Sequence, residues 1–235
     1  MIDEKIENSK DISIIIPAYN EEYRIRNVIN KYCGFFTDSE FIIVCDGIDN
    51  TKKIVSELMV CYPHLKLLEF NEKLGKGRAI IEGMRTAKHD KVGFVDADES
   101  IEPDDLKRMF DALLRADCVI ASRRLKDSRI PVKQPLKRRI SSRVFNIIVS
   151  IIFGLNIKDT QCGAKVFRKE VIRGVLNNIK TKGFEFDVEL LWRLKKKGYN
   201  IAEFPVTWKH SPGSSFGLGN APMMLLSLLK VRLWN

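Results

Sequence analysis

The chain has 235 residues, of which 45% are hydrophobic and 30% are charged, as in a soluble globular protein with one large domain or two small ones. The five cysteines are scattered and show no C-x-x-C spacing, which argues against a zinc site or a disulfide framework and indicates a reducing compartment. The formal net charge of +10 indicates an anionic partner, which can be nucleic acid, an anionic membrane or a phosphorylated substrate.

The first half of the chain alternates short apolar runs with helical patterns. Strands are expected over residues 12–16, 41–44, 65–70, 92–95 and 119–121, with helical spacing near Ile25, Ile54, Ala79 and Leu106. This alternation predicts βαβ units in a mostly parallel sheet with helices on both faces, which is a Rossmann-like α/β layout for nucleotide binding.

A basic segment follows the first half. Residues 123–143 hold nine Lys or Arg and a single acid, Asp127. Residues 125–136 contain two prolines and no period, which predicts a mobile loop. Apolar residues then recur at helical spacing over 140–152 behind a basic start. We therefore interpret residues 125–155 as a basic acceptor-binding loop and an amphipathic helix.

The last third adds short elements and an apolar C-terminal segment. We expect strands at 166–167 and 201–208, helices at 170–176 and 186–197, a loop at 212–219 and a helix at 223–234. The last helix carries Lys230 and Arg232, which favours an interfacial membrane helix over a core or partner helix. No apolar stretch reaches the roughly 20 residues that span a bilayer. The polar start MIDEKIENSKD shows no secretory leader.

Two carboxylates end the fourth expected strand. Asp96 and Asp98 lie where ligands bind in open α/β sheets, outside the carboxyl ends of the strands. Like charges this close repel unless a cation offsets them, and Mg²⁺ is commonly held by one or two carboxylates, phosphates and water. The pattern indicates a divalent metal with a diphosphate, and a solvated strand-to-helix turn is the alternative.

Three more strand ends carry polar groups, at residues 17–22, 46–49 and 71–77. Because the carboxyl ends of parallel strands are neighbours, the four ends together can hold a nucleotide diphosphate. Gly75 and Gly77 admit close backbone approach, and Lys76 or Arg78 can meet phosphate. The loop is neither a Walker A loop nor a G-x-G-x-x-G fingerprint.

Together these segments resemble a family-2 glycosyltransferase of the GT-A fold, and within it the dolichyl-phosphate mannose and glucose synthases. The resembling motifs run in family order over nearly the whole chain. They lie at residues 14–22, Asn71, 75–78, 96–98, 121–123, 138–139, 145–146, 159–163, Lys165, 183–191, 208–210 and 213–215.

The resemblance implies an inverting transfer of one hexose to dolichyl or polyprenyl phosphate, with GDP-mannose as the preferred donor and UDP-glucose as the alternative. It implies Mg²⁺ or Mn²⁺ as cofactor, no nucleic acid, and a cytoplasmic protein that is peripheral on the cytoplasmic face of a membrane. The domain division that we expect is a catalytic domain over 1–210, then a loop and an amphipathic helix over 211–235.

The resemblance also assigns roles by position. Nucleotide binding falls to Pro17, Tyr19, Glu21, Asp46, Lys76 and Gly77. The catalytic set is Asp96, Asp98, Asp159 and Gln161, in which Asp98 is the main metal ligand, Asp96 approaches ribose or metal, and the other two line the sugar and acceptor site. Arg123 with Arg138 or Arg139 would bind the lipid phosphate. That phosphate is ionised near neutral pH, so the reaction requires no strong general base.

Two positions depart from the family pattern. The usual Asp-Asp-Gly-Ser of the nucleoside pocket is Cys45-Asp46-Gly47-Ile48, so one carboxylate is missing. Ser100 stands where a metal-assisting Gln is frequent.

Two functions from other classes compete with the transferase. One is a non-catalytic basic module that binds nucleic acid or membrane, and the other is a nucleotidyltransferase on a similar sheet. Several single residues also have two interpretations. His210 can meet phosphate or be structural, and the acids at 185, 187 and 189 can contact sugar or the helix dipole. Cys162 and Trp192 are expected to be packing residues.

Overall fold

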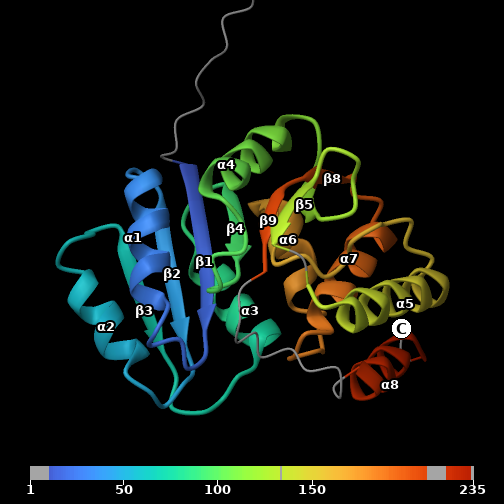
Figure 1. Cartoon of the computed structure of the whole chain (residues 1–235), viewed down its shortest axis with the longest axis horizontal. Helices are drawn as coiled ribbons and strands as arrows, with labels where there is room; N and C mark the ends of the chain where they lie inside the picture. Colours follow the sequence, from blue (N-terminus) through green and yellow to red (C-terminus); the bar gives the residue numbers. More distant parts are fainter. Residues whose placement is uncertain (1–10, 133, 211–220, 234–235) are drawn as a thin grey trace, which may run out of the picture.

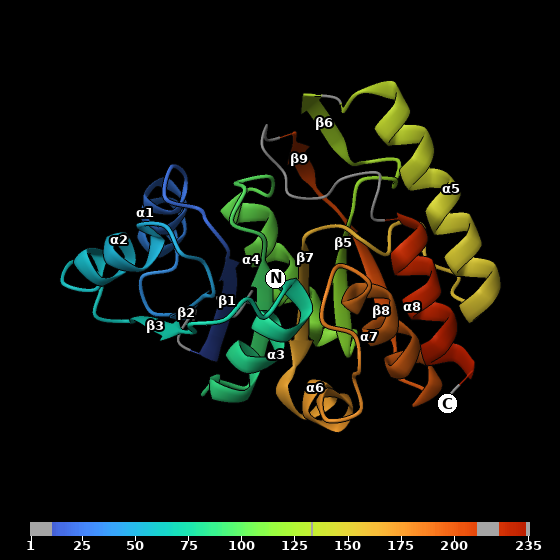
Figure 2. The same cartoon turned by 90° about the horizontal axis from the view of Figure 1, so that it is seen from below.

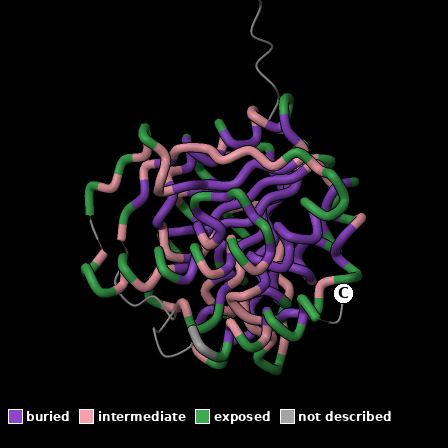
Figure 3. The backbone as a smooth tube through the Cα atoms, turned by 90° about the vertical axis from the view of Figure 1, so that its right-hand side faces the viewer, coloured by how far each residue is buried: buried purple, intermediate pink, exposed green. Residues whose placement is uncertain are grey.

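The structure is a computed structural model that describes residues 11–132, 134–210 and 221–233. A seven-stranded sheet in the order β3-β2-β1-β4-β7-β5-β8 runs through its centre (Figure 1). The strands are β1 (Ile12–Ala18), β2 (Glu40–Cys45), β3 (Leu65–Glu69), β4 (Lys91–Val95), β5 (Cys118–Ser122), β7 (Ala164–Arg168) and β8 (Ile201–Pro205). Strands β1, β2, β4, β5 and β7 consist mostly of buried residues, whereas the edge strands β3 and β8 are mostly of intermediate burial; buried backbone runs through the centre of the molecule (Figure 3).

The sheet is mostly parallel, as predicted. Strands β3, β2, β1 and β4 pair in parallel, and so do β5 and β8. Strand β7 is antiparallel to both of its neighbours, β4 and β5. The carboxyl ends of β1, β2 and β4 therefore meet at one edge, to which β7 delivers the residues just before its own start.

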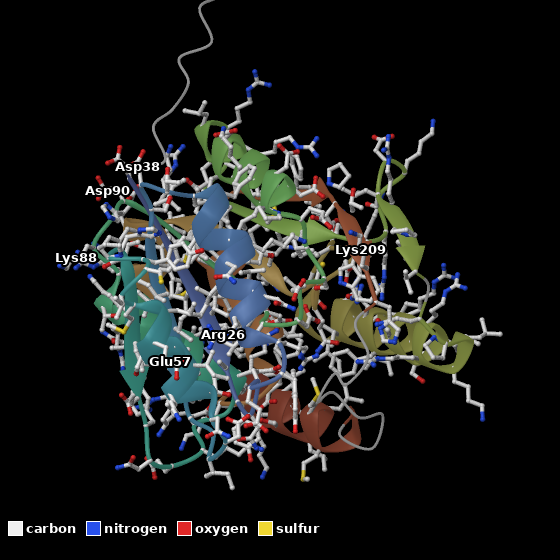
Figure 4. All side chains as sticks on the ribbon, turned by 60° about the vertical axis from the view of Figure 1, so that its left-hand side comes forward. Arg26, Asp38, Glu57, Lys88, Asp90 and Lys209 are labelled. Atoms are coloured by element: carbon white, nitrogen blue, oxygen red, sulfur yellow. The ribbon has the colours of Figure 1, made fainter. Side chains whose placement is uncertain are left out.

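Helices cover both faces of the sheet, because alternate strand residues face two separate hydrophobic clusters. Ile14 and Ile16 of β1 face one cluster and Ile15 faces the other. The first cluster packs under α1 (Ile25–Phe35), α2 (Thr51–Leu58) and α4 (Pro103–Asp111). The second packs under α3 (Lys76–Thr86), α5 (Leu136–Phe153), α6 (Lys169–Leu176), α7 (Phe186–Lys196) and α8 (Ala221–Leu233). On the first face, Arg26 of α1 pairs with Glu57 of α2 at 2.8 Å (Figure 4).

Three predictions for segments of the chain are wrong. Residues 125–136 contain strand β6 (Arg129–Val132), which pairs with β9 (Thr207–Lys209), and the Arg129 amide donates to the Val206 carbonyl at 3.1 Å. The expected strand over 201–208 is accordingly split into β8 and β9. A proline inside β6 is compatible with a short edge strand, which has no period to read. The polar loop after β3 ends at Gly75, since Lys76 and Gly77 already belong to α3.

Helix α5 is amphipathic, as predicted. Its buried residues Phe145, Val149 and Phe153 face the second cluster. On the opposite side lies an exposed apolar row, here called the α5 stripe, made of Leu136, Ile140, Val144, Ile147 and Ile151. Helix α8 packs beside α5 and α7 (Figure 2). In the described part of the chain, no helix has both the length and the hydrophobicity needed to cross a bilayer.

The predicted loop at 212–219, the motif at 213–215 and Trp234 lie outside the described residues. The division of the chain at residue 210 stays a prediction.

Candidate active site

The carboxyl ends of β1 and β4, with the residues that follow β2 and β3, enclose a first cavity of about 310 Å³. Five of the six predicted nucleotide-binding residues line it, together with both carboxylates of the Asp96-Ala-Asp98 motif. The cavity is lined by Pro17, Ala18, Tyr19, Glu21, Arg24, Asp46, Lys73, Gly75, Lys76, Ala79, Asp96, Ala97, Asp98, Gly183 and Phe184. The structure thus brings the polar groups of four strand ends to one place.

Asp46 holds the loop after β3 in place, and this loop forms one wall of the first cavity. Its Oδ2 accepts hydrogen bonds from the backbone amides of Leu74 at 2.8 Å and Gly75 at 3.1 Å. Gly75 has a φ of +83°, which a residue without Cβ adopts at little cost. Asp46 therefore lines the cavity and also orders the chain just before Lys76.

Tyr19 and Glu21 form another wall of the first cavity. The Lys73 ammonium lies 3.9 Å from the centre of the Tyr19 ring, which closes this wall with a cation–π contact. Arg24 donates to Glu21 Oε2 at 2.7 Å. Burial raises the pKa of Glu21, although the charge of Arg24 opposes this shift.

The two carboxylates after β4 are held differently. Asp98 Oδ1 accepts the Ser100 amide at 3.0 Å. The two carboxylate oxygens of Asp96 lie 2.9 and 3.2 Å from Lys76 Nζ. Burial raises the pKa of Asp96; Lys76 lowers it, and the charge of Asp98 raises it further. Gly163 lies so close that a Cβ there would come within 2.3 Å of Asp96 Oδ2.

Lys76 belongs to a buried series of alternating charges. Its Nζ lies 3.4 Å from Asp187 Oδ2, and Lys165 Nζ lies 2.6 Å from the other oxygen of Asp187. Lys165 and Asp187 are fully buried, and Lys165 also donates to the Cys162 carbonyl at 3.0 Å. Although burial lowers the pKa of Lys76, the charges of Asp187 and Asp96 hold it above its usual range. Lys76 therefore stays positively charged at neutral pH, in the lining of the first cavity.

The carboxylates fit a metal that a substrate completes. Among the described residues, no three His, Cys, Asp or Glu side chains are grouped so that they could hold a metal alone. Mg²⁺ is typically bound by one or two carboxylates with substrate phosphates and water. Asp98 and Asp96, next to a cavity of nucleotide size, match that donor set.

A second cavity of about 100 Å³ adjoins the first and shares Lys76, Asp96 and Asp98 with it. Arg123 and Arg138 also line it, together with Gln161, Ser142 and Trp208. Acids and arginines that are far apart in the sequence therefore face one space. This arrangement can hold two anions close together, each with its own positive partner.

A third cavity, of about 110 Å³, lies beside the second and shares Arg123, Ser142, Gln134 and Trp208 with it. It is lined by Arg123, Arg124, Ile130, Gln134, Arg139, Ser142, Arg143 and Trp208. The successive residues Arg138 and Arg139 thus line different cavities, because neighbours on a helix point in different directions.

The family is decided by comparison with known proteins. The model of "Glycosyl transferase family 2" matches residues 13–176, more than half of the chain. The chain belongs to this family. A dolichyl-phosphate beta-glucosyltransferase of Dictyostelium discoideum is 30% identical over 240 residues, which cover 94% of this chain and 73% of that relative. An undecaprenyl-phosphate mannosyltransferase of Micrococcus luteus is 30% identical over 199 residues, covering 83% of this chain and 82% of that relative.

A solved structure supports the same fold. Glucosyl-3-phosphoglycerate synthase of Mycobacterium tuberculosis, in complex with Mn²⁺, UDP and phosphoglyceric acid, superposes with a TM-score of 0.70 at 16% identity, covering 95% of this chain and 78% of that one. This likeness confirms the predicted GT-A fold. Membership of the family confirms the glycosyltransferase hypothesis over the binding module and the nucleotidyltransferase.

Three of the predicted site residues have contacts or positions that bear on their predicted roles. Asp159 is 1% exposed, and its carboxylate accepts hydrogen bonds from Arg123 Nε at 2.7 Å and Nη2 at 2.8 Å, so it positions Arg123; it lines none of the three cavities described above. Gly77 packs against Phe186, and its amide donates to the Lys182 carbonyl at 2.8 Å, so that amide is not available to a phosphate. Arg139 lines the third cavity together with Arg123, whereas Arg138 lines the second.

Other interpretations are decided by burial. Asp187 and Glu189 are buried in ion pairs with Lys165 and Arg193, and of the two only Asp187 lines the second cavity. The His210 ring stacks on Trp208 at 6.0 Å, which favours its structural role. Cys162 and Trp192 are buried, as expected.

Among the residues that line the second cavity, Gln134, Ser142 and Trp208 were not predicted as site residues. Ser142 lies four residues after Arg138 on α5, a spacing that places both on one side of a helix and could have identified it. Trp208 lies under the Arg123 guanidinium, which is 5.3 Å from the ring centre. The sequence places Trp208 at the end of the expected strand over 201–208 and in the motif at 208–210, but it does not show the contact with Arg123.

Proposed function

We propose that this chain transfers a hexose from a nucleotide sugar to the phosphate of a polyprenyl lipid. The observation that carries the proposal is the second cavity, in which Asp96 and Asp98 face Arg123 and Arg138. The reaction requires two anions to approach each other, and this cavity offers separate positive partners for each. The names of the relatives, which include glucosyl and mannosyl transferases acting on dolichyl, undecaprenyl and polyprenol phosphates, support the same substrate class.

In this proposal the first cavity holds the nucleotide. Tyr19, Glu21 and Asp46 bind the nucleoside, and Lys76 binds the diphosphate. Mg²⁺ or Mn²⁺, held by Asp98 and Asp96, would offset the charge of the leaving diphosphate. Solved relatives of the same fold carry Mn²⁺ or Mg²⁺ with UDP.

The acceptor phosphate lies between Arg123 and Arg138. Asp159 accepts hydrogen bonds from two N–H groups of Arg123, and these two bonds fix the orientation of the guanidinium group. An oxygen of the acceptor phosphate forms a bond to the anomeric carbon while the bond from that carbon to the diphosphate breaks. The nucleoside diphosphate leaves with the bonding electrons, and the configuration inverts. No proton needs to be removed from an ionised phosphate.

The sugar is the open part of the proposal. The sequence favours mannose, whereas the relatives that match 94% or 95% of this chain are glucosyltransferases. We therefore propose UDP-glucose as the first donor to test and GDP-mannose as the second.

We further propose that the protein binds the cytoplasmic face of a membrane through the α5 stripe and α8. Each basic residue near an anionic leaflet contributes about 1 kcal/mol to such binding.

The test uses the purified full chain with each labelled nucleotide sugar, Mn²⁺ and a polyprenyl phosphate, followed by extraction of the lipid. Label in the lipid phase is expected with one donor. Label that stays out of the lipid and passes to a soluble saccharide would overturn the proposed acceptor.

The Asp98→Asn variant should lose about 100-fold or more in rate. The Arg138→Gln variant should chiefly raise the KM for the lipid phosphate, by about tenfold. Arg173→Gln on the exposed side of α6 is the charge-matched control.

A further inference from the structure

The third cavity has an excess of positive charge. Four guanidinium groups line it, and Arg123 is paired with Asp159. Arg124 donates to neutral groups, namely the Lys158 carbonyl at 2.6 Å and the carbonyl and hydroxyl of Ser142 at 3.0 Å. Arg139 and Arg143 form no ion pair with any residue that the structure describes. Within the described part of the chain, Arg124, Arg139 and Arg143 therefore form no ion pair with a carboxylate.

These charges repel one another at close range. Burial lowers the pKa of Arg124; Asp159 opposes the shift, and the neighbouring charges of Arg123 and Arg143 lower the pKa further. An anion inside the cavity would remove this repulsion. Guanidinium groups bind phosphate through two parallel hydrogen bonds, a geometry that a lysine does not provide. The cavity is therefore suited to a phosphate group.

The substrates of the proposed reaction leave this phosphate site unused. The diphosphate lies beside Lys76 and the two carboxylates in the first cavity. The acceptor phosphate must lie beside the same carboxylates, which places it between Arg123 and Arg138 in the second cavity. Arg139 and Arg143 line neither of these two cavities.

The position of the cavity on α5 indicates the source of the anion. A helix turns about 100° per residue, so the α5 stripe points directly away from the buried Phe145, Val149 and Phe153. Arg143 lies about 60° from the centre of the stripe, on the side of the third cavity. A phosphate bound there would lie beside a row of exposed apolar side chains, as the phosphate of a bilayer lipid does beside its acyl chains.

We propose that Arg124, Arg139 and Arg143 form a binding site for the phosphate of an anionic membrane phospholipid. This inference rests on the proposed function, because it places a bilayer lipid next to the polyprenyl acceptor. Binding of the headgroup at the edge of the α5 stripe sets how the enzyme lies on the leaflet and keeps the second cavity at the level of the acceptor phosphates.

The chain offers a matched pair of variants for the test. Lys137 lies about 60° from the centre of the α5 stripe on the side opposite to Arg143, is exposed, and does not line the third cavity. The full chain is sedimented with phosphatidylcholine vesicles that contain or lack phosphatidylglycerol. Arg143→Gln should reduce partitioning onto the anionic vesicles by more than the roughly fivefold expected for one surface charge, and Lys137→Gln by no more than that.

The Arg143→Lys variant distinguishes a specific phosphate-binding site from a general electrostatic attraction to the anionic membrane. This variant keeps the charge and loses the paired hydrogen bonds, so it should lose affinity for the anionic vesicles much as Arg143→Gln does. Equal losses in Arg143→Gln and Lys137→Gln, with full binding by Arg143→Lys, would overturn the inference in favour of a general basic surface.

A second arm uses a short, water-soluble prenyl phosphate without vesicles. The KM of Arg143→Gln for this acceptor should match that of the unaltered chain, whereas that of Arg138→Gln should rise. A rise in both would assign the third cavity to the acceptor phosphate and overturn the inference. If no donor supports transfer by the unaltered chain, the proposed function fails, and the vesicle arm still decides whether the phospholipid site exists.

Discussion

At the scale of single residues, the most unusual feature is the buried pair of Lys165 and Asp187 behind Lys76. Both residues are fully buried, and Asp187 contacts both lysines. We expect Lys165→Met to lower the free energy of unfolding by about 3–5 kcal/mol, because it leaves a buried carboxylate with less compensating charge. Urea denaturation measures this change.

The same variant should weaken nucleotide binding, since Lys76 would then be drawn from Asp96 toward Asp187. The double variant Lys165→Met, Asp187→Asn serves as control and should recover part of the stability, because the uncompensated charge is gone. A double variant as unstable as Lys165→Met alone would show that the loss comes from packing and not from charge.

The cysteines give a second prediction for single residues. Burial raises the pKa of Cys33, Cys45 and Cys162 to about 12, and it also raises that of Cys118. Their thiols stay protonated and unreactive at neutral pH, whereas Cys61 is exposed. A thiol reagent should therefore titrate one group in the folded protein and all five in denaturant. Rapid reaction of a second thiol in the folded protein would contradict this expectation.

Site residues could be predicted from the sequence where carboxylate side chains come shortly after an apolar strand. Asp46, Asp96 and Asp98 come immediately after apolar runs, and all three line the first cavity. The position of Asp159 in a motif does not show that its two oxygens are taken by Arg123. The role of such a buried ion pair depends on two segments that meet only after folding.

At the scale of elements, β1 and β2 are joined by a buried carboxylate. Glu40 of β2 accepts the Ser13 hydroxyl of β1 at 2.6 Å and the Lys88 amide at 2.9 Å, and it pairs with Lys66 of β3. Burial alone would raise the pKa of Glu40, but the hydrogen bonds from Lys66, Ser13 and Lys88 hold it below its usual range.

This lowered pKa predicts how stability changes with pH. The stability that Glu40 contributes is fully present above the pKa of an unfolded glutamate, about 4.3, and is lost as the pH falls through the lower pKa of the folded state. Glu40→Gln should therefore be clearly less stable than the unaltered chain at neutral pH, and the difference should shrink at acid pH. Urea midpoints measured from neutral to acid pH check this. A difference that does not depend on pH would contradict it.

Helix α5 was predictable because its apolar residues repeat over many turns. Strand β6 was not, since four residues with an internal proline carry no period. The antiparallel direction of β7 was also hidden, because the direction of a strand depends on its partners, and both lie far from it in the sequence.

At the scale of the whole molecule, a nucleotide with its metal should stabilise the fold, because its cavity joins several strand ends of the sheet. At a ligand concentration of 100 times the Kd the gain is about 2.7 kcal/mol, or roughly 5–10 °C in Tm for a chain of this size. UDP and GDP with and without Mn²⁺ should be compared by thermal unfolding. The larger shift identifies the base that fits beside Asp46.

Asp98→Asn should abolish the part of this shift that depends on Mn²⁺ and leave the part given by the nucleotide alone. An unchanged dependence on Mn²⁺ would exclude Asp98 as a metal ligand. Chelation with EDTA should have the same effect on the unaltered chain as the substitution has in the presence of Mn²⁺.

The antiparallel strand β7 also determines when the molecule can become complete during synthesis. Strand β7 lies between β4 and β5 in the sheet, and it follows both of these neighbours in the sequence. Until β7 has left the ribosome, the edge of β4 is unpaired and β5 has no neighbour. Unpaired edges of this kind invite association with other chains. The nascent chain must therefore keep four paired strands apart from an unpaired fifth one until its C-terminal third arrives.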